Sequence, residues 1–545
     1  MSISAPVVSA AERVDERKLV EGIQERFGPG VSISRGEGGI SISIALHEAG
    51  LLPELSKCLF WEMGCSWGGF VAEEHESHWR LSYVFLASRL GWIEVLLHVP
   101  SGAHRIPSIS SGVHAADWHE REVEDLFGLS FEGHPRLGDF ILHDQVWPEG
   151  VAPHRKPHRK TMDVQQTHLR HRPNPDWRPL LVVQDPGAFA MPVGPVYEGG
   201  IGESLHFLLE TVGEDVVRAI PRLFYNFRAV EKIAEGRSVP EGLLLAERFA
   251  ATSAFAHSMG FASAIERLRN VEVPERAKRL RVVLAELERL RHHTATITDI
   301  CGSTALAVAA SQASIVEEEL LRASCAFSGH RYLFGLNKVG GLSRDFGAMA
   351  LGRLQRSVNE AAERLHVLED RLYFTSSFLD RLEDAGVVIP EKARDLNLLG
   401  PVGRASGQGH DLRQECAYNE YETYEFEVPR ESEGDGYARL RVLFQEAYQS
   451  ARMITQAIDR LEAGPVLVPE DRGSSGVGMG WVEAPNGAAL HWVRLDNSGR
   501  IERYHAMTPS FNNWLGFHVA VEEFAFQDFP IILATFGLSA TECDR

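Results

Sequence analysis

The chain has 545 residues and a formal net charge of −20 at pH 7, with 44% hydrophobic and 24% charged residues. Its length allows two or more domains with a sizeable core, and its composition is that of an ordinary globular protein. The acidic balance argues against nucleic acid as a partner, because phosphate binding needs a basic face.

The cysteines and the apolar segments indicate the redox compartment of the chain and whether it enters a membrane. Six cysteines are widely spread and no two form a Cys-x-x-Cys pair, which favours a reducing compartment and argues against an iron–sulfur cluster bound by this chain. Charged residues from Glu12 to Lys18 leave no apolar signal core. The sequence has no run of about 18 apolar residues, so no membrane-spanning helix is predicted and membrane contact is expected only through partner subunits.

Residues 1–150 are predicted to form an α+β domain, because segments such as Val31–Ile44 and Trp79–Leu86 alternate apolar and polar residues. The domain closes with Trp118–Leu137, which reads Trp-His-Glu-Arg-Glu-Val-Glu-Asp-Leu-Phe-Gly-Leu-Ser-Phe-Glu-Gly-His-Pro-Arg-Leu. This segment resembles the signature of the 30 kDa subunit of respiratory complex I at nearly every position.

Residues 151–179 are rich in His, Arg, Lys and Pro without periodicity, which predicts a linker. Their histidines repeat no metal-ligand spacing. A solvated linker, or an arm lying on an acidic neighbour, is therefore favoured over a metal site.

Residues 180–545 are predicted to be mainly α-helical, from apolar residues at three- and four-residue steps. The expected helical regions are Glu241–Arg269, Pro274–Gly329, Arg344–Ala385 and Tyr437–Ala463. Gly473–Gly480 is expected to be a loop. Its glycine string follows no predicted strand and opens no predicted helix, so dinucleotide binding is not expected.

The stretch Glu247–Ser258 reads Glu-Arg-Phe-Ala-Ala-Thr-Ser-Ala-Phe-Ala-His-Ser. It resembles a motif of the large subunit of nickel–iron hydrogenases, most closely the energy-converting, membrane-bound kind of the formate hydrogenlyase and hydrogenase-4 type. That motif carries two cysteines that bind the metals. Here Ala250 and Ser253 stand at the cysteine positions, while the frame around them, including His257, is kept.

The segment Asp528–Arg545 resembles the second cysteine pair of the same family. Ser539 and Glu542 fall on the cysteine positions, and Cys543 is one place off. Nickel and low-spin iron are held by soft thiolates, which alanine, serine hydroxyls and one carboxylate do not replace. No nickel–iron centre is therefore expected, and an active hydrogenase with unusual ligands is the least favoured interpretation.

Further segments extend the resemblance over the rest of the chain: Gly194–Phe207, Arg222–Lys232, Gly400–Tyr421, Glu483–Gly487 and Pro509–Phe511. They resemble motifs shared by the hydrogenases and by the 49 kDa subunit of complex I, which has the same fold and no nickel. The resemblance implies an α+β domain followed by a mainly helical domain of the 49 kDa and hydrogenase large-subunit type.

The complex I subunit uses its emptied metal pocket to bind the quinone head group, with a histidine and a tyrosine as proton donors. In this chain Tyr197 stands near the first of its histidines, and Ala251 stands at the tyrosine position. A polar set remains that could line the same cavity: Glu203, His206, Arg228, Glu231, His257, Arg404, Asp411 and Arg413.

Tyr197, His257, Glu203 and Arg404 are the candidate catalytic residues, with Tyr197 or His257 as donor of a proton to a bound carbonyl. The structural alternative is that the polar set forms buried ion pairs, such as Arg228 with Glu231 and Asp411 with Arg413, which any fold with buried charges needs.

The resemblance implies a peripheral subunit at the cytoplasmic face of a bacterial inner membrane, beside an iron–sulfur subunit and antiporter-like membrane subunits. The favoured function is electron transfer to quinone or another small acceptor, coupled to ion translocation. The chain is expected to bind no cofactor of its own except a quinone, with iron–sulfur clusters in its partners. A non-catalytic coupling or structural subunit is the alternative.

Overall fold

The computed structural model describes residues 16–102, 105–138, 140–142, 152–156, 183, 186–194, 205–469 and 474–545. Most of the segment expected as a linker lies outside these described residues, and so do the candidate residues Tyr197 and Glu203. Within the described part, every helix is too short or too polar to span a bilayer.

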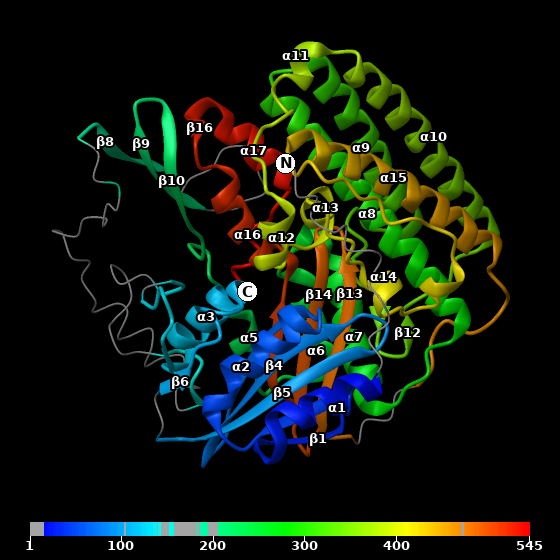
Figure 1. The fold of residues 1–545 in the computed structure, drawn as a ribbon. Helices are drawn as coiled ribbons and strands as arrows, with labels where there is room; N and C mark the ends of the chain where they lie inside the picture. The colour runs from blue at the N-terminus through cyan, green and yellow to red at the C-terminus, as the bar shows by residue number, and fades with distance from the viewer. Residues whose placement is uncertain are drawn as a thin grey trace, which may run out of the picture.

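The N-terminal domain is built on a five-stranded sheet with the order β1-β2-β5-β4-β3 (Figure 1). In this sheet β2 and β5 pair in parallel, and the other neighbouring strands pair antiparallel. The sheet and the helices beside it confirm the expected α+β fold. The alternation that predicted it is seen in the second strand, where Ile40, Ile42 and Ile44 are buried. Its strands are β1 (Val31–Arg35), β2 (Ile40–Leu46), β3 (Ser66–Glu74), β4 (His78–Ala87) and β5 (Gly91–Pro100). Its further elements are α1 (Glu16–Phe27), α2 (Leu52–Lys57), α3 (Asp117–Phe127), β6 (Arg105–Pro107) and β7 (Ser130–Glu132).

A second antiparallel sheet has the order β16-β10-β9-β8. It consists of β8 (Ala188–Val193), β9 (His206–Val212), β10 (Asp215–Arg222) and the short edge strand β16 (Phe524–Ala525). In Figure 1 the sheet lies at the upper left, on the opposite side of the molecule from the longest helices.

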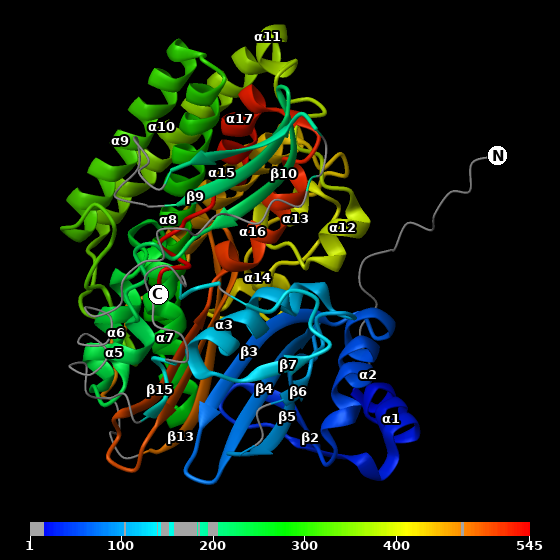
Figure 2. The same cartoon turned by 90° about the vertical axis from the view of Figure 1, so that its left-hand side faces the viewer.

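The second domain is mainly helical, as expected. Its four longest helices pack side by side (Figures 1 and 2): α8 (Glu275–Ser303), α9 (Ala307–Ser328), α10 (Ala348–Tyr373) and α15 (Gly436–Asp459). The shorter ones are α5 (Val230–Ala234), α6 (Val239–Arg248), α7 (Ala254–Arg269), α11 (Ser376–Leu379), α12 (Pro390–Asp395), α13 (Gly400–Ala405), α14 (Leu412–Glu415), α16 (Pro509–Ala520) and α17 (Phe529–Phe536). A two-stranded ribbon pairs β11 (Asn337–Lys338) with β12 (Gly341–Leu342).

The region Glu241–Arg269, expected as one helix, is two helices with a break at residues 249–253. Ala250 has an extended backbone, with φ of −134°, and Ala251–Ser253 forms a 3₁₀ turn. The break places Ala250 and Ser253 in a turn at the N-terminal end of α7.

The glycine string was predicted wrongly where the structure describes it, because residues 476–480 begin a strand. A three-stranded antiparallel sheet comprises β13 (Gly476–Ala484), β14 (Gly487–Leu495) and β15 (Ile501–Met507). A Cβ atom on Gly478 would lie 2.1 Å from the carbonyl oxygen of Ala264, and one on Gly480 would lie 2.0 Å from that of Gly260. These glycines therefore let α7 lie directly on the strand.

Buried polar contacts fix the first domain to the second. The Glu73 carboxylate on β3 accepts from Arg494 on β14 at 2.7 and 2.8 Å. Burial raises the pKa of Glu73, but Arg494 and Arg80 lower it more, to about 2. Further along the interface, the Arg545 guanidinium lies 3.0 Å from Glu122 on α3. The two domains thus share one interior.

Candidate functional site

The positions at which the sequence resemblance expects metal-binding cysteines lie close together, although they come from segments far apart in the second domain. The Ser253 hydroxyl, before α7, donates to Glu542 Oε1, after α17, at 3.0 Å. Ser539 joins the same region, because its backbone N–H donates to the Ser510 hydroxyl at 3.2 Å and Ser510 N–H donates to Glu542 Oε2 at 3.2 Å. Ala250 is fully buried in the turn beside them.

The turn that carries Ser253 is held by helix α8. The Glu288 carboxylate accepts from the N–H groups of Phe255 and Ala256 at 2.8 and 2.9 Å, which satisfies free donors at the start of α7. Arg291, one turn further along α8, donates to the carbonyl oxygen of Thr252. Burial raises the pKa of Glu288 to about 7.

A series of hydrogen bonds runs from Glu542 into the protein interior. His257 Nε2 lies 3.3 Å from Glu542 Oε1, and His257 Nδ1 lies 3.3 Å from His491 Nε2 on β14. His491 Nδ1 lies 3.0 Å from the hydroxyl of Tyr504 on β15. All four side chains are buried, and we refer to Tyr504, His491, His257 and Glu542 as the relay.

The donors along the relay follow from the chemistry of its ends. A carboxylate only accepts, so His257 Nε2–H donates to Glu542. In the tautomer that carries its proton on Nε2, His491 donates to His257 and accepts on Nδ1 from the Tyr504 hydroxyl. With His491 in this tautomer, every bond points toward the carboxylate.

The electrostatics of the relay agree with this direction. Burial raises the pKa of Glu542, but hydrogen bonds from His257 and Ser510 bring it below the ordinary value of 4.5. Burial holds the pKa of His491 well below 6.5 and that of Tyr504 well above 10. At neutral pH the relay thus has an ionised carboxylate, a neutral His491 and a protonated phenol.

Gly260 of α7 makes room for the middle of the relay. A Cβ atom there would lie 2.5 Å from Cδ2 of His491. Only glycine at this position lets the His491 imidazole pack against α7. Because α7 also carries His257, the two imidazole rings come into contact.

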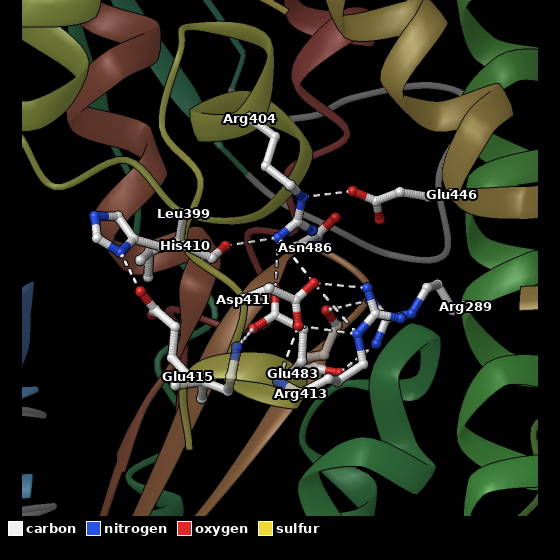
Figure 3. A network of polar contacts seen from close by, with 12 residues as sticks. Arg289, Leu399, Arg404, His410, Asp411, Arg413, Glu415, Glu446, Glu483 and Asn486 are labelled. Atoms are coloured by element: carbon white, nitrogen blue, oxygen red, sulfur yellow. Dashed lines mark hydrogen bonds and ion pairs between the residues drawn. The ribbon is translucent and has the colours of Figure 1, made fainter. Parts of the chain in front are cut away.

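A second buried cluster surrounds Arg404 (Figure 3). Arg404 Nε donates to Glu446 at 2.6 Å and Nη1 donates to Glu483 at 3.0 Å. Burial and the negative charge of Asp411 raise the pKa of Glu483 to about 7. We call this set the arginine cluster: Glu286, Arg289, Arg404, Asp411, Arg413, Glu446 and Glu483.

The sequence-predicted pairs have different outcomes. Arg413 pairs with Asp411 at 2.7 Å, as expected. Arg228, in contrast, donates to the backbone carbonyl oxygens of Phe249, Thr541 and Asp544. Glu231 is paired instead by three groups of the second domain: Arg503 at 3.0 Å, His505 at 2.9 Å and Arg545 at 3.2 Å.

Of the four candidate catalytic residues, His257 belongs to the relay and Arg404 to the arginine cluster. Tyr197 and Glu203 lie outside the described residues and stay predictions. His491 and Tyr504 were missed by the sequence analysis, because they lie in strands outside the segments that resemble known motifs. Both strands are buried along most of their length, so no alternation of apolar and polar residues marks these two side chains.

The residues at the expected ligand positions, Ala250, Ser253, Ser539 and Glu542, do not fit a nickel–iron centre. They offer a methyl group, two hydroxyls and one carboxylate, and both oxygens of that carboxylate already accept hydrogen bonds from protein groups. Among the described residues, no group of three or more His, Cys, Asp or Glu is arranged to hold a metal ion.

Comparison with known proteins identifies both domains. The family described as respiratory-chain NADH dehydrogenase, 30 Kd subunit, matches residues 54–168, and the 49 Kd subunit family matches residues 310–476 and 471–545. Formate hydrogenlyase subunit 5 of Escherichia coli (strain K12) is 30% identical over 509 residues, which are 91% of this chain and 87% of that protein.

Two further comparisons agree. The C/D subunit of NADH-quinone oxidoreductase in Acinetobacter baumannii (strain AYE) is 27% identical, over 79% of this chain and 78% of that protein. A chain in the structure of the membrane-bound sulfane sulfur reductase, an archaeal respiratory membrane complex, has a TM-score of 0.63 at 24% identity. The match covers 67% of this chain and 100% of that chain, and the likeness shows the shared fold.

The fold and the converging segments define a fused 30 kDa and 49 kDa-type protein related to subunits of complex I-like and hydrogenase-related membrane complexes. The chain belongs to the family of formate hydrogenlyase subunit 5.

Proposed function

We propose that this chain takes part in electron transfer to quinone or another small acceptor, coupled to ion translocation and without a nickel–iron centre. It works beside a separate iron–sulfur subunit and antiporter-like membrane subunits, at the cytoplasmic face of a bacterial inner membrane. Relatives named as subunits of formate hydrogenlyase and of NADH-quinone oxidoreductase support this assignment.

The series of hydrogen bonds from Tyr504 to Glu542 carries the proposal. Reduction of a quinone to a quinol takes up two electrons and two protons, so a reduction site away from water needs a proton supply. In a shift along the relay, Tyr504 passes its proton to His491 as it takes up another from solvent, His491 passes its Nε2 proton to His257, and His257 passes its Nε2 proton to Glu542. Each group of the relay thus gives up one proton as it takes up another, and the proton arrives at Glu542.

A non-catalytic coupling subunit is the second candidate function. Both carboxylate oxygens of Glu542 already accept hydrogen bonds from Ser253, His257 and Ser510. This favours a structural role for Glu542, because its hydrogen bonds are complete without a substrate. In that case the relay is a set of hydrogen bonds that closes the old ligand pocket and keeps the two ends of the domain together.

Steady-state turnover of the intact complex in native membranes separates the two functions. Reduced methyl viologen serves as the electron donor and a short-chain quinone as the acceptor. Under the proposal, His257→Gln lowers turnover by about 100-fold or more, because general acid–base steps contribute that much. Tyr504→Phe, which removes only the hydroxyl, shifts the pH profile of turnover as well as its rate. Tyr197→Phe tests the donor expected from the sequence.

Tyr83→Phe is the matched control, since Tyr83 is a fully buried tyrosine of the N-terminal domain, outside the relay. Size-exclusion chromatography checks that each variant complex is assembled. Wild-type turnover and an unchanged pH profile in assembled His257→Gln and Tyr504→Phe complexes would exclude the proton-delivery role and establish the coupling function.

A further inference from the structure

A separate cavity of about 490 Å³ lies between α3, the β8–β10 sheet and α16. Its polar lining is basic, with four arginines and two histidines: Arg121, Arg136, Arg218, Arg222, His206 and His518. None of the described residues that line it is an aspartate or a glutamate. This composition contrasts with the net charge of −20 of the chain.

The remaining walls of the cavity are apolar or aromatic. Leu208 of β9, Phe224 after β10 and Phe140 all face it. The guanidinium carbon of Arg121 lies 4.3 Å from the centre of the Phe140 ring, so charge and apolar surface adjoin directly. A ligand that fills this space therefore meets both a cationic and an apolar surface.

Carboxylates behind the wall hold two of the arginines in place. Arg136 pairs with Asp117 at 2.8 Å and Arg218 pairs with Glu210 at 3.2 Å. Burial lowers the pKa of His518 to about 4, so its imidazole is neutral at pH 7 and the arginines supply the charge. A concave surface lined by one sign of charge concentrates ligands of the opposite sign.

We propose that this cavity binds an anionic amphiphile, with a carboxylate or phosphate against the arginines of β10 and an apolar chain or ring against Leu208 and Phe224. Arginine binds both kinds of anion through paired N–H donors. The volume is that of small-molecule sites in proteins. The site is separate from the relay and does not depend on the function proposed for it.

Isothermal titration calorimetry tests the proposal on the purified complex in nanodiscs of zwitterionic phosphatidylcholine. Decanoate is expected to bind once per chain, and decanol, with the same alkyl chain and no charge, at least about tenfold more weakly. The double variant Arg218→Gln and Arg222→Gln is expected to weaken decanoate binding by a similar factor. Arg237→Gln, at an exposed arginine before α6, is the matched control and leaves binding unchanged.

Leu208→Trp provides a second variant that fills the cavity and keeps its arginines, and it is expected to abolish binding. Equal binding of decanoate and decanol overturns the proposal, as does unchanged binding in both the double variant and Leu208→Trp. Phosphatidylglycerol in the nanodiscs distinguishes two sources of the ligand. It suppresses decanoate binding if a lipid headgroup occupies the site, and has no effect if the ligand is a free anion.

Discussion

The relay and the arginine cluster are two buried polar regions of one domain. They differ in how the cost of removing polar and charged groups from water is compensated. The arginine cluster opposes several guanidinium groups to several carboxylates. Burial by itself lowers the pKa of Arg404 and raises that of Glu446, but the opposite charges reverse both shifts. The relay instead has a single carboxylate, Glu542, joined through two imidazoles to a phenol.

This difference separates a structural role from a chemical one. Charges that are opposed by charges of the other sign hold segments together, because removing one partner leaves the other buried and uncompensated. A line of imidazoles that ends on a single carboxylate needs only small shifts of protons between neighbouring atoms. We therefore expect the arginine cluster to fix the fold around the site and the relay to be the part that passes protons.

The largest expected effect comes from breaking the arginine cluster. Arg404→Met leaves Glu446 and Glu483 buried without their main partner, which is expected to reduce the free energy of unfolding by about 3–5 kcal/mol. Chemical denaturation of the purified chain measures the change. Arg364→Gln is the control, because the Arg364–Glu319 pair is about half exposed and pairs of that kind contribute about 0–1 kcal/mol. Equal losses in the two variants would contradict a special role of the cluster.

Glu542→Gln is expected to have an intermediate effect, of about 1–3 kcal/mol at neutral pH, because it weakens the hydrogen bonds to a buried charged acceptor. The folded-state pKa of Glu542 lies below 4.5, so its stabilisation is present above the unfolded pKa and is lost as the pH falls through the folded value. The difference in unfolding free energy between wild type and variant should therefore shrink below about pH 4.5. A difference that stays constant in acid would show that Glu542 is not ionised in the fold.

Ser253→Ala should have the smallest effect, a loss of about 0.5–1.5 kcal/mol, because Glu542 keeps its bonds from His257 and Ser510. Thermal unfolding of the purified chain is sensitive enough to measure it. Ser311→Ala on α9 is the comparison, since Ser311 bonds only within an exposed helical turn. A loss larger than that of Glu542→Gln would mean that Ser253, and not the carboxylate, organises the pocket.

The sequence predicted the fold well because its signals are local or extend over long motifs. Alternation in β2 and helical periodicity in α10 arise from burial of one face, which a single segment reveals. Gly478 and Gly480 misled the prediction because glycine has no side chain to alternate. Both positions need glycine because the backbone of α7, which lies more than 200 residues earlier in the chain, leaves no room for a side chain.

The site was predictable only in part for the same reason. Resemblance placed Ser253, His257 and Glu542 in one pocket, and the structure brings them together. The partners of His257 on β14 and β15 depend on strand register and on the space left by Gly260, neither of which a motif carries. Likewise, Arg228 fits the pattern of an ion-pair partner of Glu231, but in the fold it binds carbonyl oxygens of two turns.

The contacts that close the interior join positions very far apart in the chain. Ser253 and Glu542 are separated by 289 positions, and Glu122 and Arg545 by 423. During translation the N-terminal domain can form its sheet early, since its strand pairs are close in sequence. The relay cannot form until the ribosome has passed Glu542, so the site forms after the sheet of the N-terminal domain. Until Arg545 has been made, Glu122 on α3 lacks the arginine with which it pairs in the folded protein.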